Sequence, residues 1–236
     1  MKLNPMPAFA LAALAVASMQ TARAEVSSTV TLASEYDFRG ITQTAGDPAL
    51  QASLDFSTES GFYAGAWASN VDFGDGTDAD VEIDGLVGFR GSFSEDLSYD
   101  VGGVYYYFMG DKDDVPFGEL YAGLGYKAFS GKLWYSPDFS NFGESAYYVE
   151  GNLSFELPQD FSLTVHAGWS DGDYWDATND GGYMDYSVGI SKNIGNFAVG
   201  LKFVDGGDLR AAKVTPGDVF TSKSKIMVTV ATTLPW

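Results

Sequence analysis

The sequence predicts an all-β protein, a closed antiparallel transmembrane β-barrel of about twelve strands with short periplasmic turns and longer acidic extracellular loops. Three observations lead to this fold class. Apolar and polar residues alternate with period two along most of the chain, and the connections between alternating segments are short and long in turn. The composition is also rich in aromatic residues and glycine, with 17 Phe, 14 Tyr, 5 Trp and 28 Gly in 236 residues, which favours strands and tight turns.

The first alternating segment sets the pattern for the others. We expect Tyr36 and Phe38 to face lipid, and Glu35, Asp37 and Arg39 to face a water-filled interior. The expected strands span roughly 29–39, 50–57, 63–73, 81–90, 98–109, 117–127, 132–136, 147–155, 161–169, 184–190, 197–203 and 224–236.

The third segment is expected to turn its large residues to lipid and its small residues inward. Tyr63, Trp67, Val71 and Phe73 alternate there with a row of alanines at 64, 66 and 68. Aromatic residues near the segment ends are typical of an interfacial girdle. The girdle candidates are Phe62, Tyr63, Phe73, Phe155, Phe161, Phe197 and Trp236.

The connections support the same architecture. Tight connections follow every second segment, at 58–61, 91–97, 128–131, 157–160 and 193–196. Longer acidic connections follow the others, at 40–48, 74–79, 110–116, 137–144, 171–182 and 204–222. Closure without a free edge requires the last segment to pair with the first, which should bring Lys225 near Asp37 and Arg39.

A soluble sandwich or a lipocalin-like barrel would also alternate. The membrane barrel is favoured because the apolar faces are large and continuous in all the segments. The opposite faces carry charges of both signs, as a wet interior would.

The first 24 residues have the features of a secretory signal peptide. Lys2 precedes a short apolar run over 8–18, and Ala22-Arg23-Ala24 is a small-x-small cleavage site. We therefore expect residues 1–24 to be removed and residues 25–236 to form one outer-membrane barrel domain in a Gram-negative bacterium.

Composition excludes several classes of function. The net charge of −19 argues against nucleic acid as a partner, because phosphate binding needs a basic surface. The chain has no cysteine, so disulfides do not stabilise it. After the leader, no run of 18 apolar residues predicts an inner-membrane helix.

Four stretches carry a resemblance to a known family: EYDFRGITQTAGDPALQ (35–51), ESGFYAGAWASNVDF (59–73), EIDGLVGF (82–89) and YSPDF (135–139). They resemble the TorF-type porin family of exported Gram-negative proteins. The resemblance implies an outer-membrane barrel with a channel role and no catalytic residues. The alternation that ends at Trp236 also resembles the carboxy-terminal signal read by the barrel assembly machinery, although Pro235 departs from it.

The inward-facing charges are the candidate functional residues, either as a selectivity lining or as pairs that only solvate the interior. The expected pore-lining residues are Glu35, Asp37, Arg39, Asp55, Glu82, Asp84, Arg90, Asp100, Glu119, Lys127, Glu150, His166, Asp185, Lys202 and Lys225. Leaving the histidine aside, acids outnumber bases in this set by nine to five, which favours cations. A twelve-stranded barrel has a backbone radius of roughly 12 Å, so the bore should be narrow.

Two other chemistries have some support in the sequence. His166 shares a face with Ser162 and Ser170, the combination a lipid-active enzyme would need, but no GxSxG-like motif is present. Acidic loop clusters could hold Ca²⁺, yet none has EF-hand spacing, and a solvated acidic rim is the favoured interpretation.

The sequence therefore predicts a channel for passive diffusion of small hydrophilic solutes with a mild cation preference. It predicts no enzymatic activity, cofactor or resident metal. The expected partners are outer-membrane lipid, lipopolysaccharide, the barrel assembly machinery and small solutes or ions. The alternatives are a plugged structural or surface-interaction barrel and, less favoured, the lipid-active enzyme.

Overall fold

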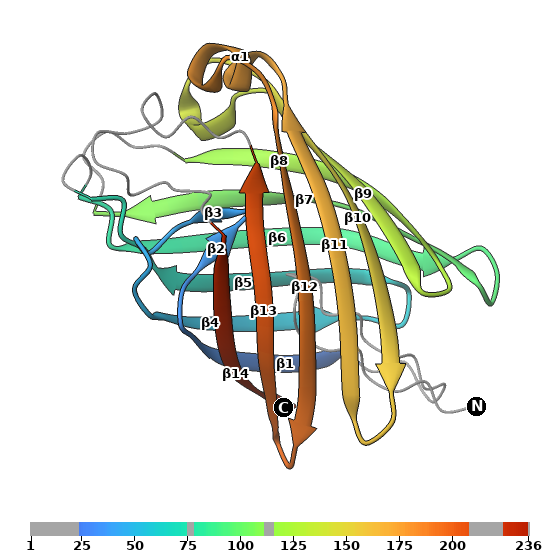
Figure 1. Cartoon of the computed structure of the whole chain (residues 1–236). Coiled ribbons are helices and arrows are strands. Elements are labelled where there is room, and N and C mark those ends of the chain that lie inside the picture. Colours follow the sequence, from blue (N-terminus) through green and yellow to red (C-terminus); the bar gives the residue numbers. More distant parts are fainter. Residues whose placement is uncertain (1–23, 75–77, 111–115, 208–223, 236) are drawn as a thin grey trace.

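The computed structural model describes residues 24–74, 78–110, 116–207 and 224–235, which form a closed antiparallel barrel of twelve strands (Figure 1). The predicted fold class is confirmed. The wall strands are β1 (Glu25–Ala33), β4 (Ala49–Ser57), β5 (Phe62–Asn70), β6 (Val81–Ser92), β7 (Leu97–Met109), β8 (Phe117–Tyr126), β9 (Phe129–Ser136), β10 (Ala146–Leu157), β11 (Phe161–Asp171), β12 (Tyr183–Ile194), β13 (Phe197–Gly207) and β14 (Lys225–Pro235). The other elements are β2 (Asp37–Phe38), β3 (Ile41–Thr42), the 3₁₀ turn η1 (Phe139–Asn141) and the helix α1 (Asp173–Asn179). Neither helical element in the described part of the chain is long and apolar enough to cross a membrane.

The predicted signal peptide, residues 1–24, lies outside the described residues except for residue 24, and Trp236 lies outside them as well. The same holds for 75–77, 111–115 and 208–223, which belong to three of the acidic connections.

The barrel closes through β1, which pairs with β4 on one side and with β14 on the other. Leu32 lies opposite Leu50 in one ladder and opposite Val230 in the other. This pairing satisfies the backbone groups that an open edge would leave without partners, and it confirms the predicted contact of first and last segments. We call one end of the barrel the short-turn end, where 58–61 and 195–196 connect strands, and the other the long-loop end.

Most of the predicted lipid-facing rows lie on the outer surface of the barrel. Large apolar side chains there are exposed, as an outer-membrane barrel requires of its lipid face. Examples are Leu50, Leu54, Val87, Val101, Leu120, Leu133, Val149, Val188, Leu201 and Val228.

Strand β5 has the opposite orientation to the one expected. Trp67 is only 8% exposed and faces inward, whereas Ala66 is on the outer surface opposite Leu54 of β4. Directly opposed residues of an antiparallel pair share a face, so the orientation of β4 fixes that of β5. Both rows of this segment are apolar, so hydrophobicity alone does not show which row faces lipid. The predicted orientation of this strand is therefore wrong. Tyr63 and Phe73 are buried as well, so they do not belong to a lipid-facing girdle.

The first expected segment divides into a wall strand and an inserted hairpin. Strand β1 ends at Ala33, and the chain then turns into the barrel, where β2 and β3 form a two-stranded hairpin (Figure 1). Tyr36 is 4% exposed and packs edge-on against Trp67 at 5.2 Å between ring centroids. Phe38 meets Tyr106 at 6.0 Å. The prediction that Tyr36 and Phe38 face lipid is therefore wrong, because both rings find aromatic partners inside the barrel.

Backbone geometry at the tip explains the sharp reversal. Arg39 and Gly40 have φ of 52° and 82°, and two consecutive left-handed residues are the requirement of a tight type I′ hairpin. Gly40 suits this position, because a Cβ atom there would lie 2.7 Å from the Cβ atom of Asp185 in β12. The hairpin tip therefore lies directly against the barrel wall.

Aromatic rings pack together at the long-loop end. Phe117 of β8 stacks on Tyr106 at 4.4 Å and contacts Phe139 of η1 at 4.7 Å. Trp175 of α1 lies 5.8 Å from Phe139 and 4.7 Å from Tyr183. The short helical elements of two long loops thus join the same core as the inserted hairpin.

The orientation of β5 can be tested with a matched pair of neighbouring substitutions. Trp67→Ala should lower the free energy of unfolding by about 3 kcal/mol, because it leaves a cavity beside Tyr36. Ala66→Leu should change it by less than about 1 kcal/mol, because the added side chain meets lipid or detergent. Urea unfolding in detergent micelles measures both values. The reverse order of effects would restore the orientation expected from the sequence.

Candidate functional site

The interior of the barrel holds a network of charged side chains centred on the inserted hairpin. Arg39 at the tip donates from Nη1 and Nη2 to both carboxylate oxygens of Glu119, at 2.9 and 2.6 Å. The Tyr106 hydroxyl donates to the same carboxylate at 2.9 Å. The Arg39 and Glu119 side chains are only 9% and 1% exposed. A bidentate, charge-assisted contact of this kind is both strong and fixed in geometry, which suits a buried guanidinium.

Aromatic faces enclose the same guanidinium. Its Cζ lies 4.3 Å from the Tyr148 ring centroid, 4.6 Å from that of Phe38 and 5.5 Å from that of Trp134. Burial by itself would lower the pKa of Arg39, but the Glu119 carboxylate more than offsets this and keeps the pKa above its ordinary value. Arg39 is therefore a permanent cation at this site.

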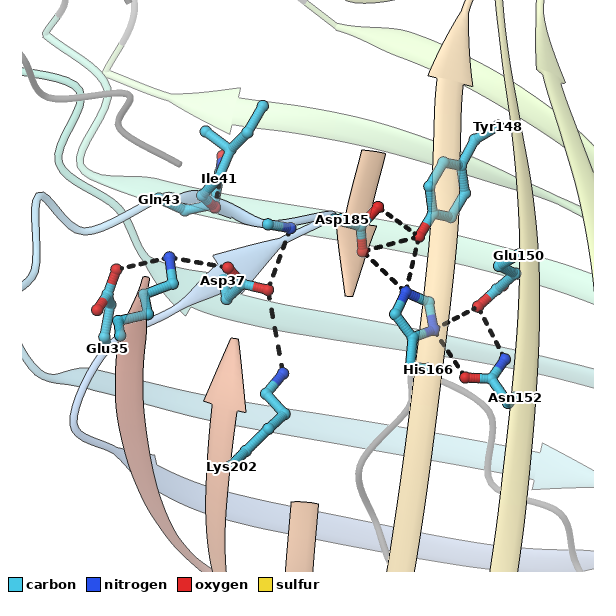
Figure 2. Close-up of polar contacts among 12 residues, drawn as sticks. Glu35, Asp37, Ile41, Gln43, Tyr148, Glu150, Asn152, His166, Asp185 and Lys202 are labelled. Atoms are coloured by element: carbon cyan, nitrogen blue, oxygen red, sulfur yellow. Dashed lines mark hydrogen bonds and ion pairs between the residues drawn. The ribbon is translucent and has the colours of Figure 1, made fainter. Parts of the chain in front are cut away.

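A second ion cluster fixes the other side of the hairpin (Figure 2). Lys225 of β14 places Nζ 2.8 Å from Asp37 Oδ1 and 2.9 Å from Glu35 Oε1, and Lys202 of β13 lies 4.0 Å from Asp37. The predicted proximity of Lys225 to Asp37 is confirmed, although Asp37 reaches it from the hairpin and not from a wall strand. Arg39 points away to Glu119.

Backbone hydrogen bonds complete the attachment of this segment. The amide of Gln43 donates to the carbonyl of Tyr36 at 2.8 Å, and the amide of Asp72 donates to the carbonyl of Gln43 at 2.8 Å. The Gly40 amide donates to Asp37 Oδ2 at 3.3 Å. The hairpin is thus bonded to itself and to the chain that follows β5.

His166 of β11 lies in a polar cluster deeper in the same half of the interior (Figure 2). Its Nε2 is 2.8 Å from Asp185 Oδ1 and 3.0 Å from the Tyr148 hydroxyl. Its Nδ1 is 2.7 Å from Asn152 Oδ1 and 3.7 Å from Glu150. In the described part of the chain none of these hydrogen-bond partners is a serine, so the geometry gives no serine–histidine pair of the kind that a lipid-active enzyme needs.

Strand β6 contributes two deeply buried carboxylates, Glu82 and Asp84. Among the described residues, Glu82 Oε2 and Asp84 Oδ1 have no hydrogen-bond partner. Burial, together with these two carboxylates, raises the pKa of the Tyr36 phenol in the inserted segment well above its ordinary value. Tyr36 is therefore neutral and available as a hydrogen-bond donor toward them.

Lys132 of β9 is an interior cation that the sequence analysis missed. Its Nζ lies 2.9 Å from Asp100 Oδ2, 4.2 Å from the Tyr121 ring centroid and 5.0 Å from that of Trp134. Lys132 directly precedes the outward-facing Leu133, so period-two alternation indicates an inward position for Lys132. The expected strand 132–136 begins at Lys132, where alternation has no preceding residue to support an inward assignment.

Lys127, expected in the interior, is instead in the turn between β8 and β9. It has φ of 54°, its side chain is 59% exposed, and its Nζ lies 3.8 Å from Asp96 of another turn. The tight turn ends the alternation one residue earlier than predicted. The structure places the other expected residues on the inward rows or on the inserted segment: Glu35, Asp37, Arg39, Asp55, Glu82, Asp84, Arg90, Asp100, Glu119, Glu150, His166, Asp185, Lys202 and Lys225.

The acidic loops do not converge on a metal-binding arrangement in the residues that the structure describes. No group of three or more His, Cys, Asp or Glu side chains is close enough there to hold an ion. Parts of the acidic loops fall outside those residues.

The closed barrel is similar in fold to solved structures of porins. The KdgM porin matches with a TM-score of 0.53 and 9% identity, over 90% of this chain and 99% of that chain. The NanC porin matches with a TM-score of 0.57 and 12% identity, over 86% and 97%. At such low sequence identity, the likeness shows a shared fold and nothing more.

The chain itself belongs to the Gcw_chp family, which is described as a bacterial protein of unknown function. The family profile matches residues 17–234. Comparison with curated proteins gives no match.

The contribution of the Lys225 cluster to stability can be measured against an exposed ion pair. Lys225→Met should lower the free energy of unfolding by about 3 kcal/mol, because Glu35 and Asp37 lose their partner in a mostly buried site. Lys127→Met should cost less than about 1 kcal/mol, since its pair with Asp96 is exposed to solvent.

Urea unfolding of both variants in detergent checks these values. Adding Glu35→Gln to Lys225→Met should recover part of the loss by removing the carboxylate that pairs with Lys225, whereas Asp37 retains Lys202 nearby. Equal costs for the two lysines would contradict the assignment of Lys225 to the hairpin anchor.

Proposed function

We propose that this protein is a porin-like outer-membrane channel for passive diffusion of small hydrophilic solutes, narrowed at its long-loop end by the β2–β3 hairpin. One observation carries the proposal: a closed barrel with an apolar outer face has ionised groups on its inner face. The side chains of Asp100 and Lys132 remain 27% and 15% exposed there. Ionised groups require water or partners, so such an interior is suited to hydrated solutes.

The location follows from the same reasoning. An apolar outer face needs lipid, and short turns at one end with long loops at the other are typical of outer-membrane barrels, whose short turns are periplasmic. This proposal includes export through the 1–24 leader, assembly through the last strand, and contact with lipid and lipopolysaccharide. It agrees with the TorF-type resemblance of the sequence, which stays a prediction.

The fold relatives support a channel in general. One of them is a KdgM porin in complex with disordered oligogalacturonate. The interior described here has more acids than bases, so we propose a cation preference for this chain. Diffusion through such a channel requires no catalytic group or cofactor.

The role of the hairpin as a constriction can be tested by conductance. The unaltered protein in a planar lipid bilayer should give small single-channel currents. Replacing residues 37–42 by a short Gly-Ser linker should raise the conductance several-fold, because the linker removes the hairpin side chains from the long-loop half. A wall substitution such as Ala66→Leu provides the control and should leave the currents unchanged. Absence of current in every variant would remove the channel proposal.

A plugged structural or surface-interaction barrel is the second candidate, and one observation favours it. The hairpin joins Phe117, Phe139 and Trp175 in a continuous core across the long-loop end. Under this alternative the unaltered protein carries no current, and the linker variant conducts. The same bilayer experiment therefore separates the two candidates.

The proposed cation preference can be measured as a reversal potential across a salt gradient. Asp100→Asn and Glu150→Gln should each shift the potential toward zero, because each removes negative charge from the interior. Asp96→Asn serves as a control, since Asp96 lies on an exposed turn and should have little influence on a narrow bore. A starting preference for anions would overturn the selectivity proposal.

A further inference from the structure

The groups that hold Arg39 come mainly from the wall and form a compact set. Glu119 of β8 supplies the carboxylate, and Tyr106 of β7 donates to it. Trp134 of β9 and Tyr148 of β10 present ring faces to the guanidinium. These are four consecutive strands of the barrel, so one stretch of rigid wall carries the whole set. A carboxylate fork with aromatic faces is the recognition chemistry of a guanidinium group.

The occupant of this set is an unusual residue for its backbone position. Type I′ turns favour Asn-Gly, and a long side chain such as Arg at φ of 52° is disfavoured. The turn chemistry alone would not select Arg39. Its side chain instead matches the wall, where it fills the site as a tethered ligand would.

We propose that the β7–β10 wall forms a recognition site for the guanidinium group of a small solute, and that Arg39 occupies this site as an internal substitute for that solute. The inference names a solute class for the proposed channel and rests on that function only for the entry of solute into the interior. A solute guanidinium that replaces Arg39 preserves the charge beside Glu119, so the buried carboxylate never lacks a partner. Exchange of one guanidinium for another therefore releases the hairpin tip from the wall while Glu119 keeps a cationic partner.

The chemistry of the site predicts its selectivity. Methylammonium has the same charge but cannot make two parallel hydrogen bonds to one carboxylate in the plane of a fork. Urea has a similar planar shape but has no charge to pair with Glu119. Methylguanidinium combines both properties and should bind best of the three.

The experiment measures binding to the folded full-length barrel domain in detergent micelles by isothermal titration calorimetry. Arg39→Asn removes the internal occupant and keeps a residue that the type I′ turn favours. This variant should bind methylguanidinium about tenfold or more tightly than the unaltered protein, in which the tethered Arg39 competes at an effective concentration of roughly millimolar or higher. Urea and methylammonium should bind at least about tenfold more weakly than methylguanidinium.

Two control variants make the result specific. Glu119→Gln added to Arg39→Asn should abolish methylguanidinium binding, because the anionic fork is lost. Arg90→Met removes the same amount of positive charge from a point of the interior near Tyr63, away from the hairpin cluster, and should bind methylguanidinium no better than the unaltered protein. Binding that survives Glu119→Gln, or that appears equally in Arg90→Met, would overturn the inference.

A second substitution keeps the test decisive if Arg39→Asn fails to give the β-sheet circular dichroism of the folded barrel. Arg39→Lys retains a cation beside Glu119 but loses the fork, and it should still gain methylguanidinium binding over the unaltered protein. No gain in a folded variant overturns the site. Because calorimetry needs no ion current, binding without conductance would remove only the channel function, and conductance without binding would remove only this inference.

Discussion

The closed ring of backbone hydrogen bonds is the constraint on which the rest of the structure depends. Since directly paired residues share a face, one orientation passes around the barrel from Leu54 to Ala66, Gly85 and Tyr105. Ala66 must therefore face outward although it is small, and Trp67 inward although it is large. Lipid adapts to a small side chain, whereas the interior beside Tyr36 must be filled. Register thus decides positions where hydrophobicity is ambiguous, and closure through β1 and β14 makes that register consistent around the ring.

Insertion of a charged loop into this ring is stable because its charges have partners at fixed places on the wall. Arg39 meets Glu119, and Asp37 meets Lys225, so neither hairpin charge is buried alone. The wall charges have the complementary need, since Glu119 is almost fully buried and would be costly without its guanidinium. The charged interior is therefore the docking surface of the hairpin as well as a candidate lining for solutes. The same residues bind the hairpin and line the interior. A change in these charges would therefore alter both the position of the hairpin, which sets the width of the bore, and the electrostatic potential inside it.

Local periodicity was sufficient for the wall and insufficient for the hairpin. The strand ranges, the closure and the nearness of Lys225 to Asp37 follow from alternation and connection lengths. Alternation from Val30 to Phe38 lapses only at Ala33 and Ser34, however, and a break of two small residues is too short to indicate the turn that follows β1. Arg39 and Glu119 are 80 residues apart, and only the three-dimensional register brings them together. Lys127 was misplaced by one residue at a strand end, where turn geometry replaces the period-two rule.

The interior cations share a feature that links selectivity to recognition. Arg39 stands over Tyr148, Lys132 over Tyr121 and Arg90 over Tyr63, each within 4.6 Å of a ring centroid. The wall thus holds its own cations with carboxylates and ring faces, the same groups that would hold a cationic solute. Acidic side chains outnumber basic side chains in the interior. A mobile cation therefore competes with few basic side chains for the carboxylates, whereas an anion competes with many carboxylates for the basic side chains. The proposed cation preference and the proposed guanidinium site therefore have the same physical origin. In both, carboxylates and aromatic rings of the wall bind a cation, and in the absence of solute they bind the chain's own basic side chains.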